Sequence, residues 1–167
     1  MAKVLLINPS YSPSYGGTRV KVVNPIYPTL GLATIAATAL QGKHKVEILD
    51  FSWRPYDFEP IRKRILQTKP DIVGITATTP LMNQLRDISV LVKDISKNIF
   101  VIGGGPHPSA LPKETLQETM LDAVLIGEAD YSFRDICDGY PLSDILGIFY
   151  RDDDQIFSTK QRPLITN

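Results

Sequence analysis

The sequence predicts an α/β fold built on a doubly wound parallel sheet, and three observations favour this class. Five short apolar segments alternate with segments whose apolar residues recur at helical spacing. The first apolar segment, residues 3–7, shows no polar alternation after its lysine, which is typical of a central strand buried on both faces. The fourth, residues 99–102, runs directly into Gly103, Gly104 and Gly105, so its carboxyl end requires backbone without side chains.

Each element of this fold can be placed on the chain. The five strands are expected at residues 3–7, 45–50, 72–76, 99–102 and 123–126. The connecting helices are expected from Pro28 to Gly42, around 61–66, from Thr79 to residue 95, around 116–121 and around 132–137. Thr79 before Pro80 is typical of an N-cap followed by the first helical residue. Right-handed crossovers and the apolar first strand favour the strand order 2-1-3-4-5.

The 167 residues fit one domain with a sizeable core. After residue 141 the pattern changes to a β-hairpin, with strands expected at 145–150 and 155–158. We therefore expect a main α/β domain at 1–141, a hairpin extension of the same domain at 142–158, and a tail or linker at 159–167.

Composition excludes several classes of protein. Lys and Arg total 18 and Asp and Glu total 18, which removes the electrostatic case for a nucleic-acid or anionic-membrane partner. No apolar run has the length of a membrane span. The single cysteine, Cys137, excludes an internal disulfide and an all-cysteine metal site in this chain, and it favours a cytoplasmic location.

The candidate site follows from the strand order. The ends of strands one, three, four and five meet at one edge of the sheet, beside the switch point where ligands bind in such folds. The segments brought there are residues 8–9, 76–79, 103–107 and 127–128. Their hydroxyls, glycines and prolines favour a large, mostly neutral ligand held by backbone and packing, rather than proton-transfer chemistry.

Several common ligands of such sheets do not fit this edge. The glycine fingerprint of a dinucleotide site is missing from the first turn, although Asp50 ends strand two, and there is no G-x-x-x-x-G-K-[ST] phosphate loop. Strand three ends in Thr76, where a phospho-acceptor domain needs a carboxylate. A flavin phosphate held by the first loop stays an alternative, and its candidate residues are Ser10, Ser12, Ser14, Gly16, Gly17 and Thr18.

The isolated titratable residues allow simpler interpretations. His44, in a Gly–Lys–His–Lys turn, is expected to be a solvated loop histidine. His107 either contacts a ligand or braces the glycine turn with a hydrogen bond. Glu128 either caps the next helix or binds a ligand amide. Cys137 is expected to be a small core residue.

Six short motifs follow one another along the chain: NP at 8–9, YPTLGL at 27–32, GKHKVEILD at 42–50, PDIVGI at 70–75, GGGPHPS at 103–109 and DAVLIGE at 122–128. In this order and spacing they resemble the N-terminal cobalamin (B12)-binding domain of B12-dependent radical SAM proteins. That superfamily includes the magnesium-protoporphyrin monomethyl ester oxidative cyclases. The resemblance covers nearly the whole chain, the closing hairpin included. It implies a flavodoxin-like (Rossmann-like) five-stranded parallel sheet that holds cobalamin at its strand ends.

The resemblance also implies where cobalamin would bind. Its dimethylbenzimidazole tail would insert between the loops after strands one, three and four, where glycines leave room for a flat ring. No catalytic residue and no protein ligand to a metal is implied. The implied cofactor contacts are Asn8, Pro9, Ser10, Thr76, Thr78, Thr79, Gly103, Gly104, Gly105, Pro106, His107, Gly127 and Glu128.

The chain departs from the family pattern in three places. It lacks the D-x-H-x-x-G motif that supplies a histidine to cobalt after strand one in the wider fold, so we expect base-off cobalamin without a histidine from that loop. The family's Gly–Glu–Gly–Glu after strand five is matched only in part by Gly127–Glu128–Ala129–Asp130. The C-x-x-x-C-x-x-C loop, which binds a [4Fe–4S] cluster and S-adenosylmethionine, is absent.

The expected function is therefore that of a cobalamin-binding module, a fragment that does not catalyse alone. Its expected partner is a C-terminal radical SAM domain of the same polypeptide, which would carry out methyl transfer or oxidative cyclisation with a [4Fe–4S] cluster and S-adenosylmethionine. Two alternatives stay open. One is a flavodoxin-like substrate- or partner-binding module without cobalamin, and the other is an FMN-binding flavodoxin-like protein.

Overall fold

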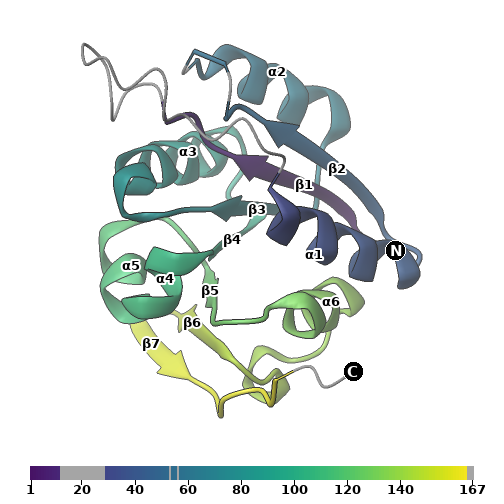
Figure 1. The fold of residues 1–167 in the computed structure, drawn as a ribbon, viewed down its shortest axis with the longest axis vertical. Helices are drawn as coiled ribbons and strands as arrows, with labels where there is room; N and C mark the ends of the chain where they lie inside the picture. The colour runs from purple at the N-terminus through teal and green to yellow at the C-terminus, as the bar shows by residue number, and fades with distance from the viewer. Residues whose placement is uncertain (12–28, 53, 56, 165–167) are drawn as a thin grey trace.

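The structure is a computed structural model that describes residues 1–11, 29–52, 54–55 and 57–164. Its centre is a seven-stranded sheet in the order β2-β1-β3-β4-β5-β6-β7 (Figure 1). The parallel part, β2-β1-β3-β4-β5, has the predicted order. The strands are β1 Lys3–Asn8, β2 Lys45–Asp50, β3 Ile72–Thr76, β4 Phe100–Gly104, β5 Ala123–Leu125, β6 Ile148–Asp152 and β7 Gln155–Ser158.

The predicted number of strands in the sheet was wrong, because the hairpin joins the sheet. β6 pairs antiparallel with β5, with Leu125 opposite Ile148, and β7 pairs antiparallel with β6. Ile148 is fully buried in this position. If β5 were the edge strand, its backbone N–H and C=O groups on that side would be exposed. Pairing with β6 of the hairpin gives these groups hydrogen-bond partners.

Helices cover both faces of the parallel strands (Figure 1). α1 and α6 pack on one face with Leu6, Ile72 and Ile102, whereas α2 and α3 pack on the other. The alternation of strand side chains separates the two cores, because Leu5 and Ile7 of β1 face α2 and α3 while Leu6 faces α1. The helices are α1 Leu30–Gln41, α2 Glu59–Thr68, α3 Met82–Ile95, α4 Pro106–Ala110, α5 Pro112–Glu118 and α6 Asp130–Asp138, with 3₁₀ turns at Thr79–Leu81 and Leu142–Asp144.

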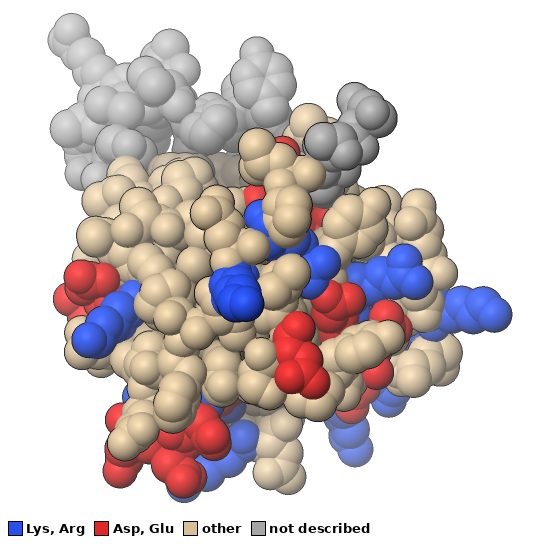
Figure 2. All heavy atoms as spheres, turned by 90° about the horizontal axis from the view of Figure 1, so that it is seen from below, with Lys and Arg blue, Asp and Glu red and all other residues tan. Residues whose placement is uncertain are grey.

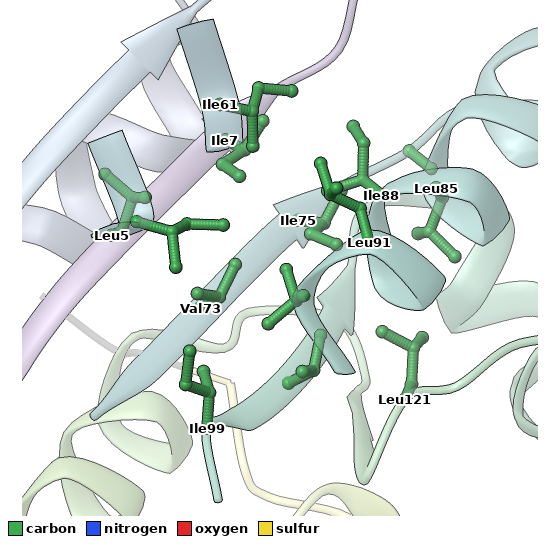
Figure 3. Packing of buried hydrophobic residues seen from close by; sticks show 14 of the residues in the cluster. Leu5, Ile7, Ile61, Val73, Ile75, Leu85, Ile88, Leu91, Ile99 and Leu121 are labelled. Carbon is green, nitrogen blue, oxygen red and sulfur yellow. The ribbon is translucent and has the colours of Figure 1, made fainter. Parts of the chain in front are cut away.

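The core between the sheet and α3 is continuous across several elements. Figure 3 shows side chains of β1, β3 and α3 directed toward one another, among them Leu5, Val73 and Ile88. Leu121, in the segment before β5, joins this core with 1% exposure. This side of the sheet is therefore filled by side chains.

Two helix predictions needed correction. Thr79 is not an N-cap: it opens a 3₁₀ turn that precedes α3, and the N-cap residue Thr78 makes no side-chain capping hydrogen bond. The single helix expected around 116–121 is replaced by α4 and α5, which meet at Leu111 and Pro112. Proline cannot donate a backbone hydrogen bond, so it begins the second helix rather than continuing the first.

The segment after β7 stays close to the domain. Gly147 donates its backbone N–H to the Lys160 carbonyl at 2.8 Å. Arg162 donates from Nε to Ser132 Oγ at 2.9 Å and forms an ion pair with Asp135. The described part of the expected tail or linker thus lies along α6.

The molecular surface agrees with the balanced composition. Lys, Arg, Asp and Glu side chains are interspersed on the face shown in Figure 2. Within the described ranges, no helix has the length and hydropathy needed to cross a bilayer.

His44 is not the solvated loop histidine that the sequence predicts. It is 5% exposed. Its Nδ1 accepts a hydrogen bond from the Ala2 backbone N–H at 3.0 Å, and its Nε2 lies 2.9 Å from Asp138 Oδ1. Because Nδ1 is the acceptor, the ring proton is on Nε2 and is donated to Asp138. His44 therefore ties the amino terminus and the turn after α1 to the carboxyl end of α6.

We expect His44→Ala to lower the free energy of unfolding by about 1–3 kcal/mol, because it leaves a cavity and an unpartnered Ala2 N–H. Urea denaturation measures this loss. Lys45→Ala, at an exposed neighbouring position, serves as the control and should change stability little. Equal stability of the two variants would contradict the structural role of His44.

Candidate functional site

A pocket of about 630 Å³ lies at the carboxyl ends of the parallel strands, on the face covered by α1 and α6. It occupies the predicted edge of the sheet, beside the β1–β3 switch point. Its lining consists of Leu6, Leu30, Gly31, Leu32, Thr34, Ile35, Gly74, Ile75, Thr76, Ile102, Gly103, Gly104, Gly105, Leu125, Gly127, Glu128, Ala129, Asp130 and Phe133.

The floor of the pocket is made by strand residues in register. Leu6 lies opposite Gly74, and Gly74 lies opposite Ile102, which forms one row across β1, β3 and β4. One step toward the strand ends, Thr76 lies opposite Gly104. Alternate residues of a strand face the same side, so Gly104 faces the same side as Ile102. Gly74 leaves room for the Leu6 side chain, since a Cβ there would lie 2.7 Å from Leu6 Cδ2.

Two helices supply the walls, with residues that lie outside the site predicted from the sequence. α1 contributes its first two turns and α6 contributes its amino-terminal end and Phe133. Gly31 could have indicated that α1 lines the site. Glycine lowers the stability of a helix, so its presence in the first turn is explained if a side chain would take up needed space there. A Cβ built at Gly31 meets no atom of the described residues within 4 Å.

The three consecutive glycines serve different purposes. A Cβ at Gly103 would lie 2.5 Å from Leu121 Cδ1, so Gly103 is needed for packing on the α3 side. Gly105 has φ +97°, and its Cβ would lie 2.8 Å from the Ala77 carbonyl oxygen, so it is needed for the turn. A Cβ at Gly104 meets no atom of the described residues within 4 Å. Of the three, only Gly104 therefore leaves space that the described part of the protein does not fill.

This difference predicts the stability of alanine variants. Gly103→Ala should lower the free energy of unfolding by about 1–3 kcal/mol through overpacking against Leu121. Gly104→Ala should leave it unchanged or raise it by up to about 1 kcal/mol, because alanine restricts the unfolded chain. Urea denaturation of the two variants distinguishes them, and equal destabilisation would show that Gly104 is also packed against the protein.

Six of the thirteen predicted site residues line the pocket: Thr76, Gly103, Gly104, Gly105, Gly127 and Glu128. Gly127 adopts φ +65° and donates its N–H to Ser109 Oγ at 3.1 Å, which fixes the turn after β5. The other seven, outside the pocket lining, are Asn8, Pro9, Ser10, Thr78, Thr79, Pro106 and His107.

Several of these seven residues make hydrogen bonds that support the strand ends. Asn8 Nδ2 donates to Asp50 Oδ1 at 2.8 Å and so joins the ends of β1 and β2. Ser10 Oγ donates to the Arg54 carbonyl at 2.6 Å. His107 Nδ1 lies 3.1 Å from Thr79 Oγ1, which matches the turn-bracing alternative. The loop residues proposed for a flavin phosphate, from Ser12 to Thr18, lie outside the described residues.

The pocket contains little charge. Glu128 and Asp130 are its only ionisable lining residues among those described; Glu128 lies in the turn before α6 and Asp130 is the first residue of α6. No group of three or more His, Cys, Asp or Glu residues that could hold a metal ion occurs in the described part of the chain. The protein's own groups here suit binding of an apolar, uncharged moiety better than acid–base catalysis.

Cys137 has the chemistry of a core residue. It is 8% exposed and packs within α6 on the core between the sheet and α1. Burial raises the pKa of its thiol from 9.0 to about 12, with a smaller contribution from the Asp138 carboxylate. Because the folded-state pKa is the higher one, this thiol's contribution to stability is present below pH 9 and is lost as the pH rises from 9 toward 12.

We expect native Cys137 to react with iodoacetamide at pH 8.5 at least about 100-fold more slowly than in the urea-unfolded chain, because only the thiolate reacts. Mass spectrometry of the alkylated protein over time gives both rates. Comparable rates in the two states would contradict the buried, protonated thiol.

The chain belongs to the B12-binding domain family, because the family model described as B12 binding domain matches residues 17–137. This confirms the family resemblance drawn from the sequence motifs. The matched segment includes β2–β5, α1 and most of α6, which are the elements that surround most of the pocket.

Three curated relatives match nearly the whole chain. An uncharacterized methyltransferase of Pyrococcus horikoshii is 36% identical over 170 residues, covering 99% of this chain and 36% of the relative. A cytidylyl-2-hydroxyethylphosphonate methyltransferase of Streptomyces wedmorensis is 30% identical over 190 residues (99% and 34%). An anaerobic magnesium-protoporphyrin IX monomethyl ester cyclase of Synechocystis sp. is 24% identical over 173 residues (98% and 33%). The chain thus spans about a third of the length of these relatives.

Two solved structures share the fold. OxsB, a cobalamin-dependent S-adenosylmethionine radical enzyme with aqua-cobalamin and S-adenosylmethionine bound, has a TM-score of 0.79 and 19% identity, covering 98% of this chain and 23% of that chain. The radical S-adenosylmethionine methyltransferase TsrM of Kitasatospora setae, with cobalamin and a [4Fe–4S] cluster bound, has a TM-score of 0.75 and 20% identity (100% and 30%). These likenesses confirm the predicted Rossmann-like α/β fold.

Proposed function

We propose that this chain binds cobalamin at the carboxyl edge of its sheet, with the lower-base tail of the cofactor in the pocket between the strand ends, α1 and α6. Gly104 is the observation that carries this proposal. It is a strand residue that faces the pocket, and its missing side chain leaves space that no described residue occupies within 4 Å. A flat ring beside the sheet uses such space, whereas Gly103 and Gly105 leave none, because a Cβ at either would be crowded by other residues.

The pocket fits the lower-base tail in size and chemistry. Its volume of about 630 Å³ is within the range of small-molecule sites. The floor offers Ile102 and the open surface over Gly104 to a flat ring, while Phe133 and Ile35 bound it from the two helices. The residues of this chain therefore bind and orient the tail.

The cofactor would be held without a histidine from this chain's first loop. Residues 8–28 contain no histidine. His44 lies at the opposite end of the sheet, beside Ala2, and is bonded to Asp138. We infer base-off cobalamin, with the tail free to enter the pocket. Bound cobalamin supplies a cobalt centre that can carry a methyl group.

We further propose that the chain is the cobalamin-binding part of a longer radical SAM enzyme that performs methyl transfer or oxidative cyclisation. The relatives of about three times its length include two methyltransferases and a magnesium-protoporphyrin cyclase. The [4Fe–4S] cluster and S-adenosylmethionine would be bound by a second domain, since the only cysteine of this chain is a buried one with a raised pKa. Other protein side chains here offer no cluster ligand set in the described residues.

We expect titration with hydroxocobalamin to give a complex that co-elutes in gel filtration and shows a base-off absorbance spectrum. FMN, titrated in parallel, should not co-elute. Co-elution with FMN and not with cobalamin would overturn the proposal in favour of a flavin site, and a base-on spectrum would overturn the placement of the tail.

Gly104→Val tests the location of the tail. Valine would fill the space over the strand end, so we expect cobalamin affinity to fall by about tenfold or more while the unfolding midpoint stays close to that of the wild type. Val90→Ile, at an exposed position on α3 outside the pocket lining, is the matched control and should bind as the wild type does. Wild-type affinity in folded Gly104→Val would contradict the proposed site.

A further inference from the structure

The segment after β7 is held on the domain by consecutive hydrogen bonds. Thr159 donates its backbone N–H to the Ile148 carbonyl at 3.0 Å, and its Oγ1 accepts the Ile148 N–H at 3.1 Å. The Lys160 carbonyl then accepts the Gly147 N–H at 2.8 Å. We call residues 159–162 the exit strap, because the chain leaves the sheet through them. Figure 1 shows the exit strap as the yellow trace that passes from β7 toward α6.

Arg162 anchors the exit strap to the beginning of α6. Its Nε donates to Ser132 Oγ at 2.9 Å, and its guanidinium forms an ion pair with Asp135. Ser132 is 1% exposed, and its hydroxyl donates to the Leu146 carbonyl at 2.7 Å. Because this donor bond fixes the hydroxyl, Ser132 presents a buried, preformed acceptor to Arg162.

The anchor is less exposed than an ordinary surface ion pair. The side chain of Arg162 is 21% exposed, whereas the four other arginines that form ion pairs in the described residues are 39–45% exposed. Arg162 also packs closely over Gly147, where a Cβ would lie 3.2 Å from Arg162 Cβ. A shielded guanidinium with two partners holds its geometry better than an exposed pair does.

The direction of the exit strap follows from the sheet. β7 runs parallel to β5, because each of them pairs antiparallel with β6. The chain therefore leaves the sheet at the edge where the parallel strands end, beside the first turn of α6. Pro163 follows the anchor directly; its ring fixes its own φ and biases Arg162 toward extended backbone.

A flexible linker would behave differently. If the nine residues from 159 to 167 formed a random coil, their ends would lie about 15–18 Å apart on average and in any direction. The bonds of Thr159, Lys160 and Arg162 remove this freedom from the first four of these residues. The exit strap is therefore part of the folded domain.

We propose that the exit strap is a rigid junction, anchored by Arg162, that fixes the direction in which the polypeptide continues from this domain. This inference rests on the proposed function, because the continuing polypeptide would be the second domain of the longer enzyme. In such an enzyme the junction holds the two domains in one relative orientation, whereas a flexible tether would let them separate and meet again.

Distances between two nitroxide spin labels, measured by double electron–electron resonance, test the junction in the purified chain. One label is attached at Leu164→Cys, which is 72% exposed, and the other at Leu66→Cys on α2, which is 55% exposed. The thiol of Cys137 is buried and stays unlabelled. We expect one narrow distance distribution. A reference pair, Leu66→Cys with Val90→Cys on α3, reports the folded domain without the exit strap.

Arg162→Ala removes the anchor, so we expect the distribution to Leu164→Cys to broaden about twofold or more as the segment gains the freedom of a coil. Arg162→Lys keeps the charge but loses the planar fork that reaches both Ser132 and Asp135, and it should give an intermediate width. Arg134→Ala removes an ion pair within α6 and is the matched control, which should keep the wild-type width.

Two outcomes would overturn the junction. A wild-type distribution as broad as that of Arg162→Ala would show that the exit strap is not rigid, and equal broadening in Arg162→Ala and Arg134→Ala would show that Arg162 is not its anchor. If the reference pair also broadens in Arg162→Ala, Asp135→Asn replaces it, because it removes the ion pair at nearly constant size. Wild-type width in Asp135→Asn would then overturn the anchor.

The junction and the proposed function fail separately. The spin-label distances are measured without any cofactor, so a broad wild-type distribution overturns the junction and leaves cobalamin binding as proposed. Absence of hydroxocobalamin binding by the wild-type chain overturns the proposed function, while a narrow distribution still supports the fixed direction of the exit strap.

Discussion

The pairing of β3 with β4 at their carboxyl ends is the constraint on which the candidate site depends. Thr76 lies opposite Gly104, and the ladder continues past the strands, where Ala77 donates its N–H to the Gly104 carbonyl at 2.9 Å. The chain then reverses through Gly105, and the His107 N–H reaches the Ala77 carbonyl at 3.3 Å. These bonds hold the backbone of Gly104 rigidly beside the pocket.

The same constraint explains why the two glycines beside Gly104, Gly103 and Gly105, are needed for the fold itself. Gly105 allows the chain to reverse, because its positive φ would be strained for any residue with a Cβ. Gly103 faces the opposite core and leaves room for Leu121. A surface formed by backbone without side chains keeps its shape only where adjacent residues hold that backbone in place. Here the adjacent residues, Gly103 and Gly105, are themselves glycines. This arrangement supports a ligand that lies flat against the sheet.

The walls of the pocket depend on a second, distant interaction. α1 and α6 meet on one face of the sheet, and His44 and Asp138 join the turn after α1 to the end of α6. Within α6, Arg134 lies 3.5 Å from the second Asp138 oxygen, and Arg162 of the segment after β7 forms an ion pair with Asp135 of α6. The helix that presents Phe133 to the pocket is thereby fixed at the far end from the site.

What the sequence determined by itself is the class of fold, the parallel strand order and the edge of the sheet where the candidate pocket lies. Apolar runs, turn residues and the right-handed crossover rule are local or pairwise signals, and they suffice for these features. The order of the six motifs along the chain indicated the B12-binding family. Which of the consecutive glycines faces open space could not be predicted, because the answer depends on Leu121 and Ala77 across the fold.

Tertiary structure alone decided the contribution of α1 and α6 to the pocket, the addition of the hairpin to the sheet, and the burial of His44. Each depends on residues far apart in the chain: Asp138 lies 94 positions after His44, and β6 pairs with β5 through Ile148 and Leu125. The local sequence around a histidine in a turn is the same whether or not a distant residue lies close enough to bind it. Only the packed fold therefore distinguishes a solvated histidine from a buried one.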